Sequence, residues 1–215
     1  MAETISDIIN DPICSFAKGE ERGVHLLKQL ILFAPNNEAA FELRQQIEDE
    51  VGHAELFNTR LKDLDIDCEG LSKNLDSLYD YAQTCVDEKD WVKSVSVQAV
   101  IEELAMASFI YRYPELDEKT QTVLKKVIED EKRHLAFCLN QLVKFADSDS
   151  RARTEEVHKN SISIMRAAAE QEGLSKDQLN DAKEIMKKAY FLHNSRLKKI
   201  GIVLPKVSFS KTKPL

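Results

Sequence analysis

The sequence contains one seven-residue word twice, as IEDEVGH at residues 47–53 and as IEDEKRH at residues 128–134. The two copies agree at five of seven positions, and their histidines lie 81 residues apart. Residues three apart on an α-helix differ by about 60° in direction and about 4.5 Å in height. Each copy therefore places its second glutamate and its histidine on one side of a helix.

The glutamate and histidine of each copy, Glu50 with His53 and Glu131 with His134, share their helical phase with apolar residues. These apolar residues are Leu43, Ile47, Phe57, Leu61, Leu124, Val127 and Leu135. Because the apolar side of a helix faces the protein core, the charged pairs are predicted to point inward. Buried charges need a partner of opposite charge, so something positively charged is expected beside the acids of the repeated word.

Hydrophobic periodicity on both sides of the repeat predicts four long helices and a crossover. The helices are expected at about residues 11–34, between Asn37 and Asp65, at 87–113 and at 117–145, with a short crossover helix at 71–85. Two antiparallel hairpins joined by a long crossover form the ferritin-like, all-α four-helix bundle. Two additional C-terminal helices, at 154–172 and 175–200, and a coil from 204 to 215 complete the prediction. We expect one domain over residues 1–203, with the bundle at 12–146.

The composition favours a helical globular protein and argues against nucleic-acid-binding and membrane-spanning proteins. With 215 residues, 43% hydrophobic and 31% charged, the chain suits one helical globular domain. The net charge of −7 argues against nucleic-acid binding, which needs a basic surface. The N-terminal residues do not resemble a secretory leader, and no apolar run is long enough to span a membrane. We therefore expect a cytoplasmic monomer or dimer without stable membrane association, and buried thiols at the four scattered cysteines.

Two further glutamates also lie on the apolar side of a helix, one on each of the other two long helices. Glu20 lies in phase with apolar residues of the first helix, and Glu102 with those of the third; their neighbours Glu21 and Glu103 fit the inward phase less well. Glu20 precedes Glu50 by 30 residues, and Glu102 precedes Glu131 by 29. Each half of the bundle thus has one upstream glutamate and one Glu-x-x-His pair, related by an approximate twofold axis.

Four carboxylates in a core of low dielectric would repel one another and lose their hydration. Two divalent cations would neutralise them, and two imidazoles would complete a mixed oxygen and nitrogen ligand set that favours iron, with manganese possible. We expect six metal ligands, Glu20, Glu50, His53, Glu102, Glu131 and His134, no other catalytic residue, and open positions for dioxygen. Asp49 is predicted to support His134, and Asp130 to support His53, through the free ring nitrogen.

Coincidence is the main alternative to this interpretation, because a single Glu-x-x-His is common in a glutamate-rich chain. Glu155 and His158 form such a pair without the preceding aspartate or an upstream acid, and we leave them out of the site. His25, His158 and His193 are expected to be surface or packed residues. Six apolar residues could line a cavity beside the metals or simply pack in the core: Leu27, Ile31, Phe57, Met106, Phe109 and Phe137.

The set of six ligands resembles the ferritin-like di-iron carboxylate superfamily, over residues 12–146. Within it the chain is most similar to the aldehyde-deformylating oxygenases, in Gly19-Glu20, in Ile101-Glu102 and in the stretch from Asp130 to Phe137. The C-terminal part from Leu174 to Gly201 is also similar. Gly52 stands where that family has a basic residue.

The resemblance implies a non-haem di-iron oxygenase or oxidase. It would use dioxygen to oxidise a small or medium organic substrate, with aliphatic aldehydes among the candidates. Its electrons would come from an external donor such as a ferredoxin and its reductase. Two alternatives stay open at this point. One is an iron-oxidising or peroxide-reducing protein of ferritin or rubrerythrin type, without an organic substrate; the other is a non-catalytic helical interaction module.

Overall fold

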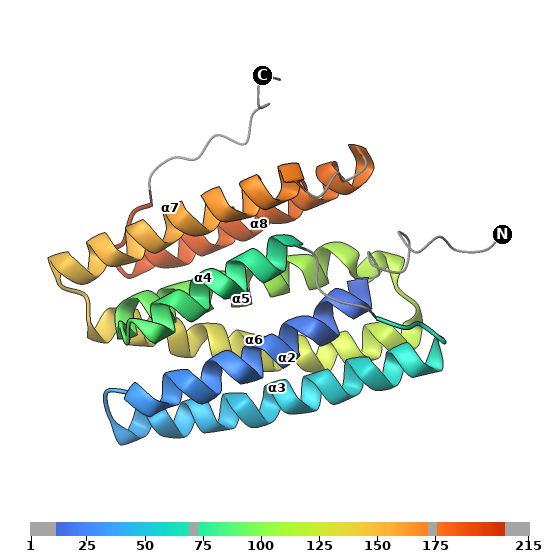
Figure 1. The fold of residues 1–215 in the computed structure, drawn as a ribbon, viewed down its shortest axis with the longest axis horizontal. Helices are drawn as coiled ribbons and strands as arrows, with labels where there is room; N and C mark the ends of the chain where they lie inside the picture. The colour runs from blue at the N-terminus through green and yellow to red at the C-terminus, as the bar shows by residue number, and fades with distance from the viewer. Residues whose placement is uncertain (1–11, 69–72, 172–175, 205–215) are drawn as a thin grey trace.

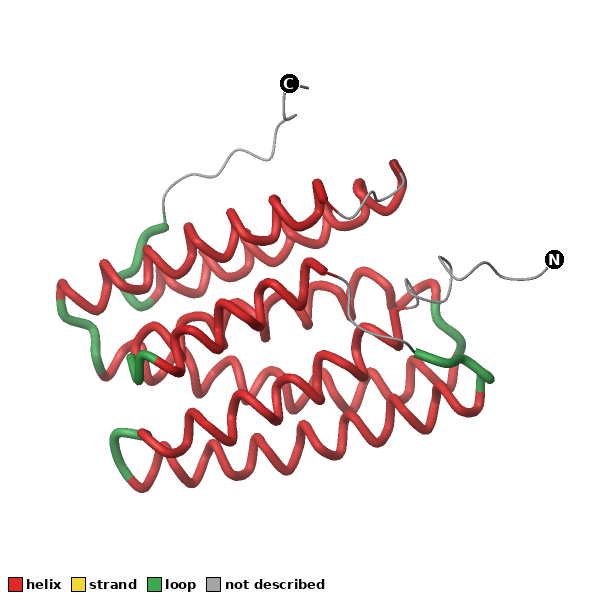
Figure 2. Tube along the Cα trace, in the orientation of Figure 1, coloured by secondary structure: helices red, strands yellow, loops and turns green. Residues whose placement is uncertain are grey.

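The structure is a computed structural model, and it describes residues 12–68, 73–171 and 176–204. These residues form helices and loops, and they contain no strand (Figures 1 and 2). The elements are α2 (Pro12–Leu30), η1 (Ile31–Phe33), α3 (Asn37–Asp63), α4 (Lys73–Asp87), α5 (Trp91–Arg112), η2 (Tyr113–Glu115), α6 (Glu118–Lys144), α7 (Ser148–Gln171) and α8 (Lys176–Lys199). The predicted all-α class is confirmed.

The long helices lie roughly parallel to one another and form layers (Figure 1). α2 packs against α3 and α5 against α6, which gives the two predicted hairpins of the bundle, while α3 also contacts α6 and α2 contacts α5. α4 is the crossover helix and contacts α2, α5 and α7. α7 and α8 cover the outer side of α5, so α5 is surrounded by other helices.

Side-chain caps explain where several helices begin. Asn36 accepts a hydrogen bond from the backbone N–H of Ala39 at the start of α3, and Asp90 accepts one from Lys93 at the start of α5. Asp117 caps α6 in the same way through the N–H groups of Lys119 and Thr120. These caps set the ends of the helices that carry the inward acids.

The start of α7 corrects one prediction. The helix was expected to begin at residue 154, but α7 begins at Ser148. Asp147 accepts a hydrogen bond from the backbone N–H of Ser150 at 2.7 Å, which is the geometry of an N-terminal cap. The predicted coil beyond residue 204 lies outside the described residues, and the single domain over residues 1–203 stays a prediction.

Two apolar clusters occupy the bundle on either side of the inward acids. One contains Leu27, Leu43, Val97 and Leu135, and the other is built on the rings of Phe16, Phe57 and Phe109, which meet edge to face or at a tilt. No helix in the described part of the chain is long and apolar enough to cross a membrane.

A disulfide corrects the prediction that all four cysteines are thiols. Cys14 near the start of α2 is bonded to Cys68, which follows α3, with the two Cα atoms 5.6 Å apart. Cys85 and Cys138 are free and buried, as expected. The spacing of the cysteines gave no sign of this pairing, because it depends on the loop after α3 returning to α2. Disulfides are rare in the cytosol, so this bond does not favour the cytoplasmic location expected from the sequence.

Removing this disulfide should destabilise the fold. The bond closes a loop with a sequence separation of 54, and constraining a loop of this size in the unfolded chain stabilises a protein by about 2–4 kcal/mol. We expect Cys14→Ser/Cys68→Ser to lower the free energy of unfolding by about that amount in urea titrations. Wild-type protein with reductant should behave like the double variant. Equal midpoints for oxidised, reduced and variant protein would contradict the prediction.

Candidate metal centre

The six residues predicted as ligands converge from four helices into one buried cluster. Glu20 comes from α2, Glu50 and His53 from α3, Glu102 from α5, and Glu131 and His134 from α6. Their exposed fractions range from 1% to 7%. The helical phase read from the sequence thus places the six groups in the interior.

The cluster divides into two groups, each of which could hold a metal ion. Glu20, Glu50, His53 and Glu131 form one group, and Glu50, Glu102, Glu131 and His134 form the other, with the ligand atoms of each group within 4.8 Å of one another. Glu50 and Glu131 belong to both groups, whereas Glu20 and Glu102 each belong to one. Two of the four carboxylates are thus shared by the two groups, and the other two are not.

The two histidines turn the same nitrogen toward the carboxylates. Nδ1 of His53 lies 3.4 Å from Glu131 Oε1 and 3.6 Å from Glu20 Oε2. Nδ1 of His134 lies 3.2 Å from Glu50 Oε1 and 3.4 Å from Glu131 Oε2.

The other nitrogen of each ring faces an aspartate across the bundle. His53 Nε2 lies 3.2 Å from Asp130 Oδ2, and His134 Nε2 lies 3.1 Å from Asp49 Oδ2. These are the two pairings expected from the repeated word. A carboxylate that accepts the Nε2 proton leaves the Nδ1 lone pair free to bind a metal.

The donor atoms fit a pair of cations. His53 Nδ1, His134 Nδ1 and Glu131 Oε2 are buried without a hydrogen-bond partner. With the proton on Nε2, each Nδ1 lone pair faces the lone pairs of carboxylate oxygens, so the contact is attractive when a proton or a metal cation lies between them. The residues present therefore suit two metal ions with mixed oxygen and nitrogen ligands.

The pKa values of the cluster reflect its excess of negative charge. Burial, together with the negative charge of neighbouring glutamates, raises the pKa of Glu20 and Glu102 well above the usual value. Burial alone would lower the pKa of His134, but Asp49, Glu131 and Glu50 outweigh it and raise the pKa to about 12. Without cations the cluster balances its charge by taking up protons, and divalent ions would replace those protons.

Arg133 is a functional candidate that the inward phase did not single out. Its Nη2 donates to Asp49 Oδ2 at 2.6 Å and to Asp130 Oδ1 at 3.1 Å, so one guanidinium joins both aspartates. The symmetry-related position in the first copy of the word is Gly52, which has no side chain to offer. The sequence did contain a signal for Arg133. It stands between the last acid and the histidine of the repeated word, which puts its side chain beside the aspartates.

Removing Arg133 should weaken metal binding more than it weakens the fold. Arg133→Ala frees both aspartates that orient the histidines, and losing such outer partners lowers metal affinity about 10- to 100-fold. The ion pairs are about 40% exposed on the arginine side, so stability should fall by less than about 1 kcal/mol. Lys132→Ala, which removes only a surface pair with Glu129, is the control. Equal Fe(II) or Mn(II) affinity in both variants would contradict this role.

Two buried amides fix one of the two unshared carboxylates. Gln46 and Gln98 both donate to Glu102 Oε1, from α3 and from the preceding turn of α5. On the other side of the cluster Gly23 faces Glu50, and a Cβ there would lie 3.7 Å from Glu50 Oε2. The surroundings of the two halves therefore differ, although their six ligands are related by an approximate twofold axis.

A cavity of about 410 Å³ reaches the four glutamates and neither histidine. Its walls come from α2, α4, α5, α7 and α8 and are mainly apolar, with Leu78, Ile101, Phe109 and Ile185 among them. The predicted lining needs correction, because only Phe109 of the six proposed residues lines it. Leu27, Ile31, Phe57, Met106 and Phe137 pack in the core clusters instead, and α8, which lies outside the bundle, supplies part of the true wall.

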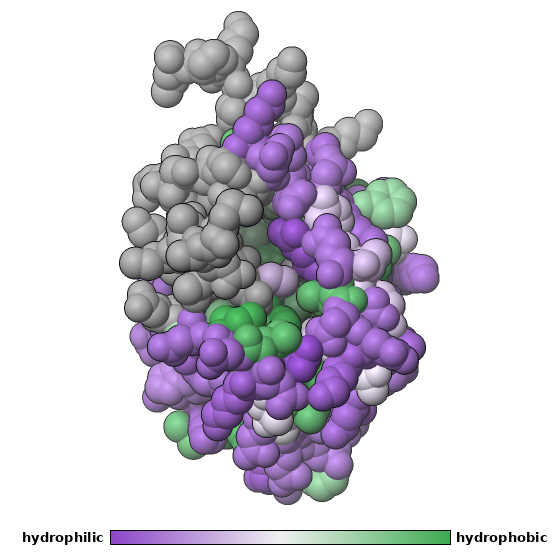
Figure 3. Space-filling model, turned by 90° about the vertical axis from the view of Figure 1, so that its right-hand side faces the viewer, coloured by the Kyte–Doolittle hydropathy of each residue, from purple (hydrophilic) through white to green (hydrophobic). Residues whose placement is uncertain are grey.

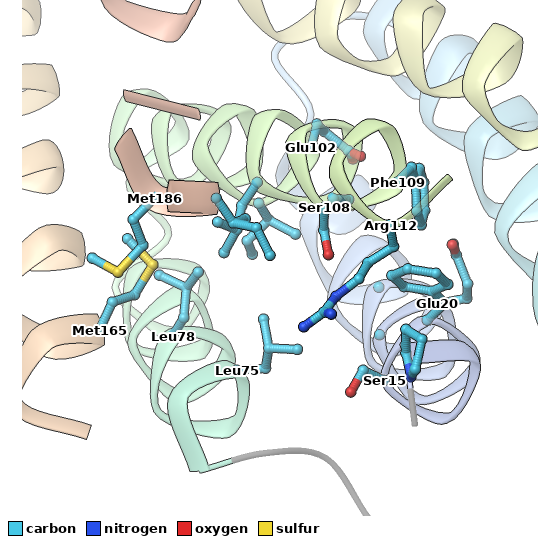
Figure 4. Close-up of a pocket in the computed structure, with 18 of the residues that line it drawn as sticks. Ser15, Glu20, Leu75, Leu78, Glu102, Ser108, Phe109, Arg112, Met165 and Met186 are labelled. Carbon is cyan, nitrogen blue, oxygen red and sulfur yellow. The ribbon is translucent and has the colours of Figure 1, made fainter. Parts of the chain in front are cut away.

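Polar side chains mark one end of the cavity. The guanidinium of Arg112 points into it between Ser15 and Leu75, and Glu20 and Glu102 also line it (Figure 4). Arg112 pairs with Asp181 of α8 at 3.1 Å and with Glu115. At this end of the molecule, a patch of apolar side chains lies at a recess beside hydrophilic ones (Figure 3). The arrangement suits an apolar molecule that approaches the carboxylates from the side opposite the aspartates.

Comparisons with known proteins agree with this fold. The sequence model of a family described as "Ferritin-like domain, actinomycetes" matches residues 4–171. A search of the curated proteins finds no match. Among solved structures, "Protein 19 with aldehyde deformylating oxidase activity from Synechococcus" superimposes with a TM-score of 0.78 at 18% identity, over 88% of this chain and 87% of that one. At this identity the likeness shows a shared fold.

Proposed function

Because the chain belongs to the family described as the ferritin-like domain of actinomycetes, we propose that its buried cluster holds two iron ions. In this proposal the two ions would be held by the two groups of ligand atoms, which share Glu50 and Glu131 and add Glu20 and His53 in one group and Glu102 and His134 in the other. The protein would act as a non-haem di-iron oxygenase or oxidase on a small or medium organic substrate. Manganese is the second candidate metal.

The observation that carries the proposal is the cavity beside the glutamates. A protein that only stores iron needs a route for ions, whereas a largely apolar space of about 410 Å³ matches the size of sites for organic ligands. The cavity is lined by the four glutamates of the cluster and by neither histidine. A substrate in the cavity would therefore lie beside the carboxylates that would hold the metal ions.

The residues of this chain have distinct parts in the proposed reaction. Two bound irons would supply the electrons and the binding positions for dioxygen. Asp49, Asp130 and Arg133 hold the two imidazoles in the tautomer that binds metal. Gln46 and Gln98 hold Glu102 by hydrogen bonds. The apolar wall keeps bulk water from the reacting atoms.

The substrate class is an aliphatic molecule, with an aldehyde as the first candidate. Its support is the apolar wall together with the name of the Synechococcus protein, which shares the fold and carries aldehyde deformylating oxidase activity. Turnover also requires electrons from outside, and a ferredoxin with its reductase is the proposed donor. A soluble protein partner of that kind needs no membrane contact.

Single-turnover experiments test the proposal. Protein loaded anaerobically with two equivalents of ferrous iron is mixed with dioxygen, alone and with aliphatic aldehydes of several chain lengths, and the products are identified by mass spectrometry. We expect product only with iron, dioxygen and a chain that fits the cavity. Repeated oxidation of excess ferrous iron, with no organic product at any chain length, would contradict the proposal and favour an iron-oxidising protein.

A further inference from the structure

The twofold symmetry of the six ligands does not extend to the side chains one helical turn before them. Gln98 precedes Glu102 by four residues on α5, whereas Phe16 precedes Glu20 by four residues on α2. The amide of Gln98 donates a hydrogen bond to Glu102 Oε1. The ring of Phe16 has no polar group and packs edge to face against Phe109. One ligand helix therefore carries a hydrogen-bond donor where the other carries a hydrocarbon.

The other two ligand helices differ in the same way. Gln46 precedes Glu50 by four residues on α3, and Val127 precedes Glu131 by four residues on α6. The amide of Gln46 is buried and donates to Glu102 Oε1 at 2.9 Å, so both glutamines of the site converge on one oxygen. The carbonyl oxygens of these two amides are buried without a hydrogen-bond partner. Such burial costs free energy, and donation to Glu102 is what offsets it.

Two hydrogen bonds to one oxygen limit the ways in which Glu102 can bind an ion. A carboxylate oxygen offers two lone pairs, and two amide N–H groups already occupy those of Glu102 Oε1. The side chain is held in one orientation, with Oε2 left for an ion. Within the described ranges, no amide or hydroxyl group donates to Glu20. Both oxygens of Glu20 therefore stay available, and its side chain is free to change orientation.

The space beside the two unshared glutamates is also unequal. Gly23 lies three residues after Glu20, and a Cβ at this position would lie 3.7 Å from Glu50 Oε2. Ala105 lies three residues after Glu102 and already carries a Cβ. Both positions line the large cavity. The cavity therefore has room for one more methyl group on the side of Glu20, next to a shared ligand, and this room lets a carboxylate move.

We propose that the group with Glu102 and His134 binds its ion first and more tightly, and that the group with Glu20 and His53 holds an exchangeable ion. This inference rests on the proposed di-iron function, and the two buried glutamines act in it as positioning residues. Hydrogen-bonded partners of a metal ligand raise metal affinity about 10- to 100-fold. A ligand that is already fixed also loses less conformational entropy when an ion binds. The mobile carboxylate of Glu20 is then the ligand that can open a coordination position toward the cavity.

The location of the first ion tests the inference. Crystals of the full-length protein are grown with one equivalent of manganous ion, and the occupancy of each position is measured by anomalous diffraction. We expect the occupancy beside Glu102 to exceed that beside Glu20 by about 10-fold or more. Equal occupancies, or a stronger peak beside Glu20, would overturn the inference while leaving the di-iron proposal intact. A cluster without any manganese would overturn both.

Replacing the two amides should remove the preference. Gln46→Leu/Gln98→Leu keeps approximately the same volume, and thermal melts without metal check that it folds. We expect nearly equal manganese occupancies in this variant at one equivalent. Gln45→Leu, which replaces an exposed glutamine of α3, is the matched control and should keep the wild-type preference. A strong preference for the Glu102 position in the double variant would contradict the positioning role.

Single-site variants give a solution test that leaves the amides in place. Glu20→Gln keeps the group with Glu102 complete, and Glu102→Gln keeps the group with Glu20 complete. Because each variant holds one ion, repulsion between two ions does not affect the comparison. Free manganous ion is followed by electron paramagnetic resonance during titration. Glu20→Gln should bind manganese about 10-fold or more tightly than Glu102→Gln. Equal affinities of the two variants would overturn the inference.

Discussion

Replacing Glu131 by glutamine is expected to abolish binding of both metal ions. Glu131 is 1% exposed and is one of two carboxylates that belong to both ligand groups, with its oxygens 3.4 Å from the Nδ1 atoms of His53 and His134. An amide has the same shape but no charge, and its NH₂ group would face a ring nitrogen or a cation. Both sites therefore lose a ligand in one substitution.

Thermal stability in the presence of metal measures this loss. At a free metal concentration 100 times the Kd, each occupied site stabilises wild type by about 2.7 kcal/mol. For a chain of this size, this raises Tm by about 2–4 °C per kcal/mol. Glu131→Gln should show no such increase with ferrous or manganous ion. A metal-dependent Tm increase equal to that of wild type would contradict the role of Glu131 in both groups.

The matched control is Glu155→Gln. Glu155 and His158 form the third Glu-x-x-His of the chain, but the structure places this glutamate on α7, away from the bundle. The variant should bind two metal ions with wild-type affinity and show the full increase in Tm. The comparison therefore separates the effect of the inward cluster from the effect of removing any acid from such a motif.

Filling the large cavity should abolish substrate oxidation while leaving the metal ions in place. Ala105 lines the cavity one helical turn after Ile101 and one turn before Phe109, and its side chain is not a ligand. Ala105→Phe would occupy the space that the substrate needs. Because displacing a reacting group by about 1 Å can cost about 100-fold in rate, we expect a loss of at least that size.

Two measurements check the cavity prediction. Product formation in single turnover should fall, whereas the metal content and the metal-dependent increase in Tm should match wild type. Ala152→Phe, on the exposed face of α7, is the control for adding a phenyl ring and should be fully active. Wild-type product yield in Ala105→Phe would place the substrate elsewhere.

The fold and the inward cluster could be predicted because they depend on local periodicity. Each Glu-x-x-His pair of the repeated word lies on the same side of its helix as apolar residues, and this side faces the core of the folded protein. The pairs are Glu50 with His53 and Glu131 with His134. The start of α7 could not be read in this way, since Asp147 in a run of Ser and Asp was interpreted as part of a loop and not as a cap.

The parts that could not be predicted depend on contacts between distant segments. Glu103 was expected to fit the inward phase poorly, yet it is buried, because α7 and α8 cover the outer side of α5. The pairing of Cys14 with Cys68 depends on the path of a loop. The cavity wall includes Ile185 and Asp181 of α8, and nothing in the helical pattern of the bundle indicates which outer helix covers the glutamates.

Anomalous diffraction from a crystal grown with ferrous or manganous salt tests the central claim most directly. We predict two anomalous peaks about 3.5–4 Å apart. Glu50 and Glu131 should lie between them, with His53 Nδ1 bound to one and His134 Nδ1 to the other. A map with the six side chains in their present positions and no anomalous peak among them would contradict the account.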